Sequence, residues 1–320
     1  MNILKLKPAF KDYLWGGQIL KEKYGKDTNL AILAESWEVS GHPDGPSTIL
    51  NKEYAGMTLS EYLDQKDNKP LGKLNLDLNE LPVLVKFIDA FSDLSIQVHP
   101  NDEYSLKHEG DNGKTEMWYI LEAKPGSKIY YGTKKAMSKS EFKQSIDNDT
   151  ILEKLNHVEV KKGDVIFVEA GTIHAIGAGI VICEIQQNSN ITYRLYDFNR
   201  KDAQGNLREL HVDKAIAVST LTPLSTDFKA QGQEIKYKNH TRQLLVTCPY
   251  FTTYKIEVCG EFDLNVSPDH FKAIVVISGE VSLETQKEKI NLTKGESCFI
   301  DAGTSDIKVS GSGVYLTITL

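Results

Sequence analysis

Leu94–Asp102 reads Leu-Ser-Ile-Gln-Val-His-Pro-Asn-Asp, an alternation of apolar and polar residues that is typical of a β-strand and the turn after it. Residues two apart in a strand project from the same face, so Gln97 and His99 share a face. Glu116 and His174 lie on two further predicted strands. Together the three strands offer two imidazoles, a carboxylate and an amide oxygen, a donor set that suits zinc, iron or nickel. The pattern predicts a metal site inside a β-barrel.

The other two strands come from Gly113–Tyr119 and Gly163–His174. If the earlier strand begins at its glycine, Lys114 and Glu116 share a face. The later segment fits the Gly-x5-Pro-x-Gly-x2-His pattern of the sheet-rich proteins called cupins, apart from the proline, and Gln97 stands where cupins carry the first of two histidines. A Gln-x-His pair alone is more often part of a hydrogen-bonded core than of a metal site. The spacing of all three segments favours the metal site.

A narrower resemblance rests on five segments, which together are similar to type I phosphomannose isomerase. They are Gln97–Asp102, Lys114–Tyr119, Gly171–Ala175, Glu184–Ser189 and Thr192–Asp197. The resemblance covers essentially the whole chain, and its specific motifs lie between Leu84 and Arg200. The chain looks like the short bacterial form, which lacks the inserted helical domain of longer relatives.

This resemblance implies a zinc-dependent isomerase that interconverts mannose 6-phosphate and fructose 6-phosphate through a cis-enediol. It implies one zinc ion per chain, with Gln97, His99, Glu116 and His174 as the ligands. Gln97 is the weakest of the four, because an amide binds zinc poorly and also fits the second coordination sphere.

The same resemblance assigns roles beyond the metal. Arg194 would bind the charged or enediolate oxygens of the substrate through its forked guanidinium. Lys114 and Glu184 are the two candidates for the group that moves the proton. Three further residues are candidates for contacts to the phosphate: Ser95, Lys86 and Arg200. Lys86 interrupts an apolar predicted strand, and such a lysine either reaches solvent or faces a polar cavity.

The composition narrows the class of protein. A net charge of −7 over 320 residues argues against a nucleic-acid or anionic-membrane surface. The sequence shows no apolar run long enough to span a bilayer and no signal-peptide pattern at its start. The four cysteines lack Cys-x-x-Cys spacing and are predicted to be reduced thiols of a cytoplasmic protein: Cys183, Cys248, Cys259 and Cys298. The expected partner is a phosphorylated hexose, and no protein partner is indicated.

An internal repeat predicts how the chain is divided. Lys162–His174 lines up with Lys294–Asp306, with Lys, Gly, Phe, Ala, Gly and Thr agreeing in place. Asp306 falls where His174 stands, and the second copy has no His/Glu set. We therefore predict an all-β fold of two cupin or jelly-roll barrels. Residues 1–238 would form the catalytic domain with the metal site, and residues 239–320 a cupin-like domain without metal ligands.

Outside these motifs, a few peripheral helices are expected. Met57–Gln65 and Ser138–Asn156 carry apolar residues at helical spacing. Trp15-Gly16 and Glu35-Ser36-Trp37 are predicted to be core and turn rather than active site.

Two other classes of function fit parts of the pattern. His99, Glu116 and His174 alone would satisfy the 2-His-1-carboxylate iron site of a cupin oxygenase, which consumes O₂. A non-enzymatic sugar-binding module is the third possibility. It would be attached to a DNA-binding helix-turn-helix or a basic arm, and the sequence shows neither. The basic residues near the ligands and the narrow motif matches favour the isomerase.

Overall fold

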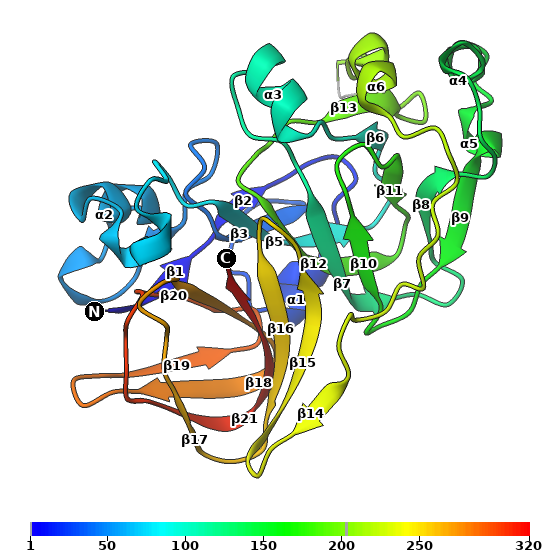
Figure 1. Cartoon of the computed structure of the whole chain (residues 1–320). Coiled ribbons are helices and arrows are strands. Elements are labelled where there is room, and N and C mark those ends of the chain that lie inside the picture. Colours follow the sequence, from blue (N-terminus) through cyan, green and yellow to red (C-terminus); the bar gives the residue numbers. More distant parts are fainter. Residues whose placement is uncertain (1, 202–203) are drawn as a thin grey trace.

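The computed structural model describes residues 2–201 and 204–320. Within these ranges the strands form three antiparallel sheets, and short helices lie around them (Figure 1). The predicted all-β fold is confirmed in part, since the structure is mostly β. Each sheet follows an open path between two edge strands, so the predicted closure into two barrels is not confirmed. In the same ranges, no helix combines the length and apolar character that crossing a bilayer requires.

We name the three sheets by position, and their strands follow in order of pairing. The C-terminal sheet is β14 (Glu234–Lys236), β15 (His240–Thr247), β16 (Thr252–Val258), β21 (Ile307–Thr319), β18 (Lys272–Glu284), β20 (Ser297–Ile300), β1 (Ile3–Lys7) and β4 (Thr48–Ile49), with β17 (Phe262–Leu264) paired to β21 and β19 (Lys289–Thr293) to β18. The central sheet is β10 (Val165–Val168), β7 (Glu116–Ala123), β12 (Ile180–Gln187), β5 (Val83–Ala90), β3 (Glu35–Val39) and β2 (Ala9–Lys11). The outer sheet is β13 (Tyr193–Tyr196), β6 (Ile96–Val98), β11 (His174–Ile176), β8 (Lys128–Thr133) and β9 (Leu155–Glu159).

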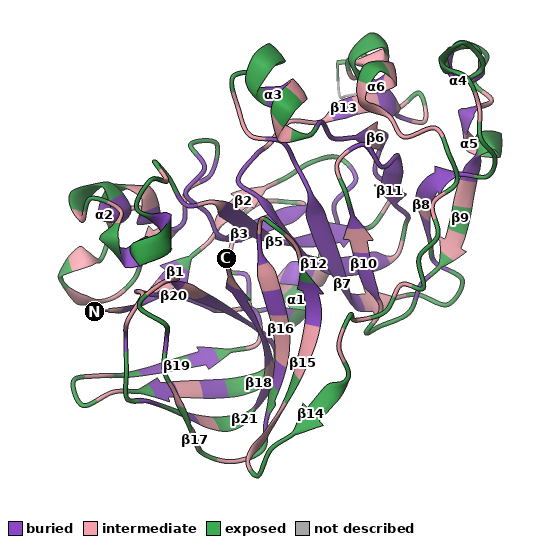
Figure 2. Cartoon of the chain, viewed as in Figure 1, coloured by how far each residue is buried: buried purple, intermediate pink, exposed green. Residues whose placement is uncertain are grey.

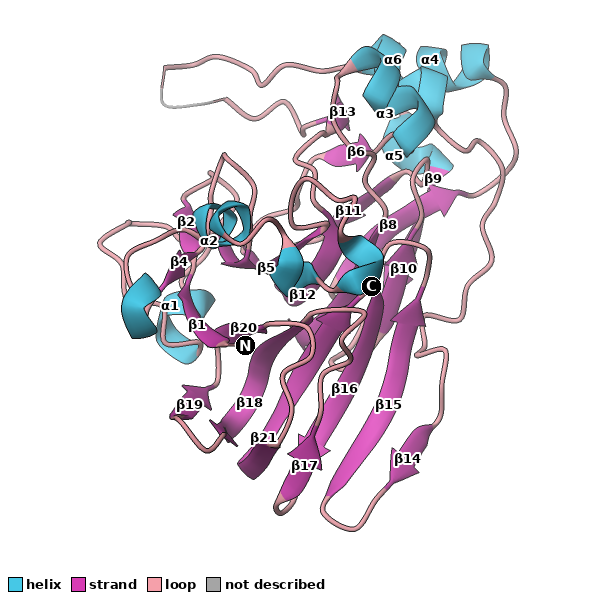
Figure 3. Ribbon diagram, turned by 60° about the vertical axis from the view of Figure 1, so that its left-hand side comes forward, coloured by secondary structure: helices cyan, strands magenta, loops and turns pink. Residues whose placement is uncertain are grey.

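The helices are short, and α3 to α6 gather at one end of the molecule (Figure 3). The described residues contain α1 (Ile19–Lys23), α2 (Leu59–Gln65), α3 (Asp102–His108), α4 (Lys139–Asp147), α5 (Ile151–Lys154) and α6 (Val212–Val218), and the 3₁₀ turns η1 (Lys52–Tyr54), η2 (Lys69–Leu71) and η3 (Lys73–Asn75). Both predicted helical segments are confirmed, but the second is split into α4 and α5. Asp149, with φ of 56°, interrupts the helical backbone there, and the final residues of that segment already belong to β9.

The central sheet lies between the other two, and apolar side chains on each of its faces pack against a neighbouring sheet. Its strands β5 and β12 are buried along their whole length (Figure 2). On one face, Val85 and Phe87 belong to the same core as Phe271 of the C-terminal sheet. On the other face, Ile88 shares a core with Ile129 of the outer sheet. A strand with two apolar faces fits a middle layer.

Alternation along the central strands also aims polar side chains toward the outer sheet. Since Ile88 of β5 and Ile182 of β12 face that sheet, Lys86 and Glu184 on the same strands face it too. Glu116 of β7 follows the same rule beside Trp118. The face of the central sheet that is turned toward the outer sheet therefore brings buried charges into the space between these two sheets.

The two copies of the sequence repeat fold alike. β10 begins at Val165 and β20 at Ser297, the same distance into each copy. Gly163 and Gly295, just before these strands, both have φ of 93°, in the left-handed region that favours glycine. β10 pairs with β7 and β20 pairs with β18, so the strand partners correspond as well. The predicted repeat is confirmed in the backbone.

The N-terminal strand belongs to the C-terminal sheet. β1 lies between β20 and β4, with Ile3 opposite Ile300. Nearby, Nζ of Lys26 lies 2.6 Å from the carboxylate of Glu38 and also donates to the carbonyl of Gly295. Both charged side chains are buried. A shared sheet, a shared core and the hydrogen bond from Lys26 to Gly295 thus join the N-terminal and C-terminal parts of the chain.

Candidate active site

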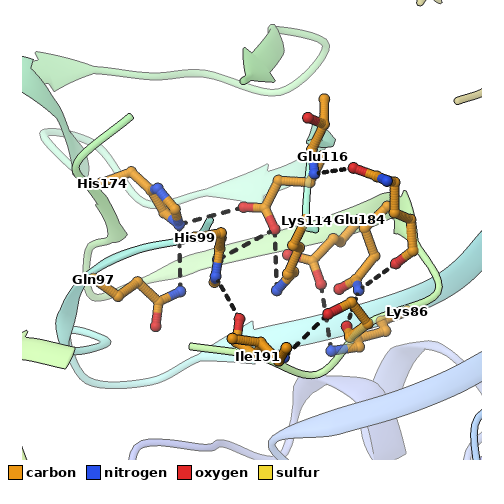
Figure 4. Close-up of polar contacts among 12 residues, drawn as sticks. Lys86, Gln97, His99, Lys114, Glu116, His174, Glu184 and Ile191 are labelled. Atoms are coloured by element: carbon orange, nitrogen blue, oxygen red, sulfur yellow. Dashed lines mark hydrogen bonds and ion pairs between the residues drawn. The ribbon is translucent and has the colours of Figure 1, made fainter. Parts of the chain in front are cut away.

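His99, Glu116 and His174 meet between the central and outer sheets (Figure 4). Nε2 of His99 lies 3.6 Å from Oε2 of Glu116, and Nε2 of His174 lies 3.4 Å from Oε1. All three side chains are buried, and their ligand atoms lie within 4.8 Å of one another. Two imidazoles and a carboxylate converging in this way can hold a divalent metal ion.

Backbone carbonyls fix both imidazole rings. Nδ1 of His99 donates to the carbonyl of Ile191 over 2.8 Å, and Nδ1 of His174 donates to that of Thr172 over 2.8 Å. Because a carbonyl only accepts, each ring carries its proton on Nδ1 and turns a free Nε2 toward Glu116. Burial lowers the pKa of His174 to about 4 and that of His99 well below its ordinary value. Neutral rings with a free Nε2 are the form that binds a metal.

Glu116 is held from two sides. Nε1 of Trp118 donates to its Oε1 over 3.0 Å, and Nζ of Lys114 lies 3.1 Å from its Oε2. Burial raises the pKa of Glu116 to about 7, against the opposing charge of Lys114. The condition for Lys114 and Glu116 to share a strand face is not met, since β7 begins at Glu116 and not at Gly113. The Lys114 ammonium still reaches the carboxylate.

Gln97 completes the group from the outer sheet. It lies opposite His174 in the pairing of β6 with β11, and its Nε2 is 3.3 Å from Nε2 of that histidine. Ile96 and Val98 point to the other side of β6, into an apolar core, as the alternation predicts. The amide is therefore adjacent to the metal-ligand cluster.

Lys86, Glu184 and Glu35 lie on the face of the central sheet that is turned toward the outer sheet, and Lys114 lies just before β7. Nζ of Lys86 lies 3.6 Å from Oε2 of both Glu35 and Glu184, and 4.6 Å from the centre of the Trp37 ring. Burial alone would raise the pKa of Glu184, but the charges of Lys114 and Lys86 outweigh it and lower that pKa. Glu184 is therefore a buried carboxylate that the neighbouring ammonium groups keep ionised.

These charged groups border a cavity of about 310 Å³. Six residues that the sequence singles out line it: Lys86, Ser95, Gln97, Lys114, Glu184 and Arg194. The metal-ligand cluster lies next to these lining residues, because Gln97 contacts His174 and Lys114 contacts Glu116. Arg194 of β13 pairs with Gln97 of β6, so the register of the outer sheet places the guanidinium beside the amide.

Arg200 lies outside this lining. Its guanidinium pairs with Asp197 and donates to the carbonyl of Asp93. Arg208, which the sequence pattern did not single out, lines the cavity. Trp15 and Glu35 also line it, although only a core or turn role was predicted for them. The polar lining residues Tyr13 and Asn190 were also missed, and Thr192 was named only as part of a family segment.

Comparison with known proteins identifies the same family throughout the chain. The family model "Phosphomannose isomerase type I, catalytic domain" matches residues 3–121, and "Mannose-6-phosphate isomerase, cupin domain" matches residues 241–319. The chain is 38% identical over 309 residues to mannose-6-phosphate isomerase ManA of Bacillus subtilis, covering 96% of each. It is 37% identical over 297 residues to mannose-6-phosphate isomerase of Streptococcus mutans, covering 92% of this chain and 90% of the relative.

Solved structures agree with the sequence comparison. The crystal structure of mannose 6-phosphate isomerase from Bacillus subtilis superimposes with a TM-score of 0.93 at 32% identity, covering 100% of both chains. A variant of phosphomannose isomerase from Salmonella typhimurium shares the fold, with a TM-score of 0.80 at 19% identity over 99% of each chain. The resemblance first indicated by Gln97–Asp102 and Lys114–Tyr119 is therefore confirmed over the full length. The chain belongs to the type I phosphomannose isomerase family.

Proposed function

We propose that the chain is a mannose-6-phosphate isomerase, which interconverts mannose 6-phosphate and fructose 6-phosphate. The observation that carries this proposal is the buried His99–Glu116–His174 cluster behind a cavity that basic side chains line. Two relatives that match more than nine tenths of the chain carry this name. The proposal joins that family activity to a site whose residues suit it.

The metal in this proposal is one zinc ion per chain, held by His99, Glu116 and His174. Nε2 of His99 is buried and has no hydrogen-bond partner within residues 2–201 and 204–320, as expected of an atom that binds an ion, and it lies 3.6 Å from Oε2 of Glu116. A 180° rotation of the Gln97 amide would turn its oxygen toward the same point, which would make it the fourth ligand. When bound, the ion supplies positive charge that polarises the substrate oxygens.

The residues of the chain would carry the proton transfer. Conversion of the aldose to the ketose takes a proton from C2, forms an enediol, and returns a proton to C1. Glu184 is our candidate base, because its Oε2 is buried without a hydrogen-bond partner among the described residues. Lys114, an ammonium held by Glu116, would donate to the substrate oxygens. Arg194, opposite Gln97, would bind the enediolate with its forked donors.

Charge favours this cavity over a larger one for a phosphorylated sugar. A cavity of about 590 Å³ lies elsewhere in the structure, and its described lining includes Asp77, Glu80, Asp102 and Asp111 but no basic side chain. Such a surface repels a phosphate dianion. In the smaller cavity, Ser95 and Lys86 stay candidates for phosphate contacts, while the predicted role of Arg200 stays a prediction.

The division of the chain is part of the same proposal. Residues 1–238 would form the catalytic part, and residues 239–320 a cupin-like part without metal ligands. The metal-ligand cluster of the described residues lies wholly in the first part, and the cupin-domain match begins close to the proposed boundary. A cytoplasmic location stays a prediction.

An anaerobic assay tests the activity and separates it from the alternatives. Purified protein should interconvert mannose 6-phosphate and fructose 6-phosphate without O₂, and elemental analysis should find about one zinc per chain. Iron with O₂ uptake would favour the oxygenase that His99, Glu116 and His174 alone would also suit. Sugar binding without interconversion would favour the binding module.

A further inference from the structure

The rim of the cavity carries a basic residue with no assigned role. Arg208 lines the cavity together with Lys86, Lys114 and Arg194. Its side chain is 32% exposed, whereas those of Lys86 and Lys114 are buried. Arg208 is therefore more accessible to solvent than either lysine.

The two lysines are already engaged by buried carboxylates. Lys86 lies between Glu35 and Glu184, 3.6 Å from each, and Lys114 lies 3.1 Å from Glu116. These pairs are buried, so moving either ammonium to a phosphate would leave a carboxylate uncompensated. The arginines differ in this respect. Neither makes an ion pair with these carboxylates in the described part of the chain.

Arg194 lies at the metal end of the cavity. It pairs with Gln97 in the outer sheet, and its Nε is buried without a hydrogen-bond partner among residues 2–201 and 204–320. Nη1 of Arg194 donates to the carbonyl of Glu209 over 2.8 Å, and the amide of His211 donates to the backbone carbonyl of Arg194 over 2.8 Å. These bonds tie the segment that carries Arg208 to β13. Arg208 is thus held near Arg194.

A buried carboxylate orients Arg208 without saturating it. Nη1 of Arg208 lies 3.5 Å from Oδ1 of Asp197, and the Asp197 side chain is only 5% exposed. The same oxygen also accepts from Arg200. A guanidinium has five donors, so one shared contact of this length leaves most of the Arg208 fork available.

We propose that Arg208 binds the phosphate of the sugar substrate and so selects phosphorylated over free hexoses. The proposal rests on the proposed isomerase function. The reacting carbons, C1 and C2, must lie near the metal-ligand cluster, and the phosphate on C6 is at the opposite end of the sugar. That end points toward the rim, where Arg208 presents a planar fork that fits phosphate oxygens. Arg200 then acts indirectly, by holding Asp197.

Steady-state kinetics of Arg208→Gln test this assignment. A charge-assisted hydrogen bond contributes about 1.5–3 kcal/mol, so KM for mannose 6-phosphate should rise roughly 10- to 100-fold. The inhibition constant for inorganic phosphate should rise by a similar factor. kcat and metal content should change little, because Arg208 does not touch the reacting carbons. Arg208→Lys should lie between the two, since it keeps the charge but loses the fork.

Two further variants make the result specific. Arg242→Gln removes an arginine of the C-terminal sheet, which lies over the Tyr254 ring, and should leave both constants unchanged. Arg200→Gln distinguishes the competing assignment. If Arg200→Gln raises the phosphate inhibition constant and Arg208→Gln does not, the proposal is wrong while the isomerase function stands. If circular dichroism shows that Arg208→Gln does not fold, Arg208→Lys becomes the test. An unchanged inhibition constant for phosphate in Arg208→Lys would then overturn the proposal. A wild-type protein without isomerase activity contradicts the proposed function itself.

Discussion

His174 and Asp306 occupy equivalent places in the two copies of the repeat, but their surroundings differ. His174 is buried beside Glu116, whereas Asp306 is exposed and accepts from the hydroxyl of its neighbour Ser305. We predict that His174→Ala removes bound zinc and isomerase activity together, because it deletes one of three buried ligands. Asp306→Ala is the matched control and should keep both. Elemental analysis and the isomerase assay check the pair, and zinc retained in His174→Ala would refute the ligand assignment.

Arg194 is predicted to act on turnover rather than on the metal. Arg194→Ala should lower kcat on the order of a hundred- to a thousandfold, as expected for the loss of one charge-stabilising donor. Zinc content should be unchanged, because Arg194 is not among the proposed ligands. Arg194→Lys should recover only part of the rate, since an ammonium lacks the bidentate fork. Near-normal turnover of Arg194→Ala would show that the residue has another role.

At the residue scale the sequence predicts what alternation controls and misses what the tertiary structure controls. Gln97 and His99 could be placed on one face because a strand has a fixed period of two. Glu35 could not be placed in the site, because its contact with Lys86 depends on the register of β3 against β5. The sequence also does not indicate which of Arg200 and Arg208 lines the cavity. Both lie on irregular chain after β13, where spacing does not set direction.

The buried ion pair between Lys26 and Glu38 joins the segment after α1 to the turn before β20, through the Gly295 carbonyl. We predict that Lys26→Met destabilises the protein by about 3–5 kcal/mol, because it leaves Glu38 as an uncompensated buried charge. Urea denaturation measures this free energy of unfolding. Lys23→Met is the control: it breaks the Lys23–Glu122 pair, in which Lys23 is half-exposed, and should have little effect. Equal effects of the two changes would contradict the prediction.

Helices and strands with strong local sequence signals could be predicted, but the residues at which they begin and end were harder to predict. The helix α2 begins after Thr58, which accepts from the Glu61 amide in a capping box that the sequence displays. The break between α4 and α5 depends on a single residue, Asp149, in a left-handed conformation. The repeat predicted equivalent strands because its glycines mark the same turns. It did not predict that β1 crosses to the C-terminal sheet, since that pairing joins opposite ends of the chain.

The whole molecule is acidic, with a net charge of −7, while its candidate substrate cavity is lined by four basic side chains. Local positive potential in an acidic protein attracts a dianion over a short range, and salt screens that attraction. We predict that KM for mannose 6-phosphate rises with ionic strength. Free mannose, which lacks the phosphate, should be used on the order of a thousandfold less efficiently or worse. Assays of both sugars at low and high salt check this, and comparable efficiency on mannose would point to a general sugar isomerase.

The position of β1 has a consequence for biosynthesis. The ribosome makes β1 long before its partner β20, because Ile3 of β1 pairs with Ile300 of β20. Until then β1 exposes an unpaired edge and the apolar side chains of Ile3 and Leu4, which are fully buried in the folded protein. Pairing of Ile3 with Ile300 also closes a very long loop, which slows folding. The nascent chain must therefore keep β1 from aggregating until β20 has been synthesised.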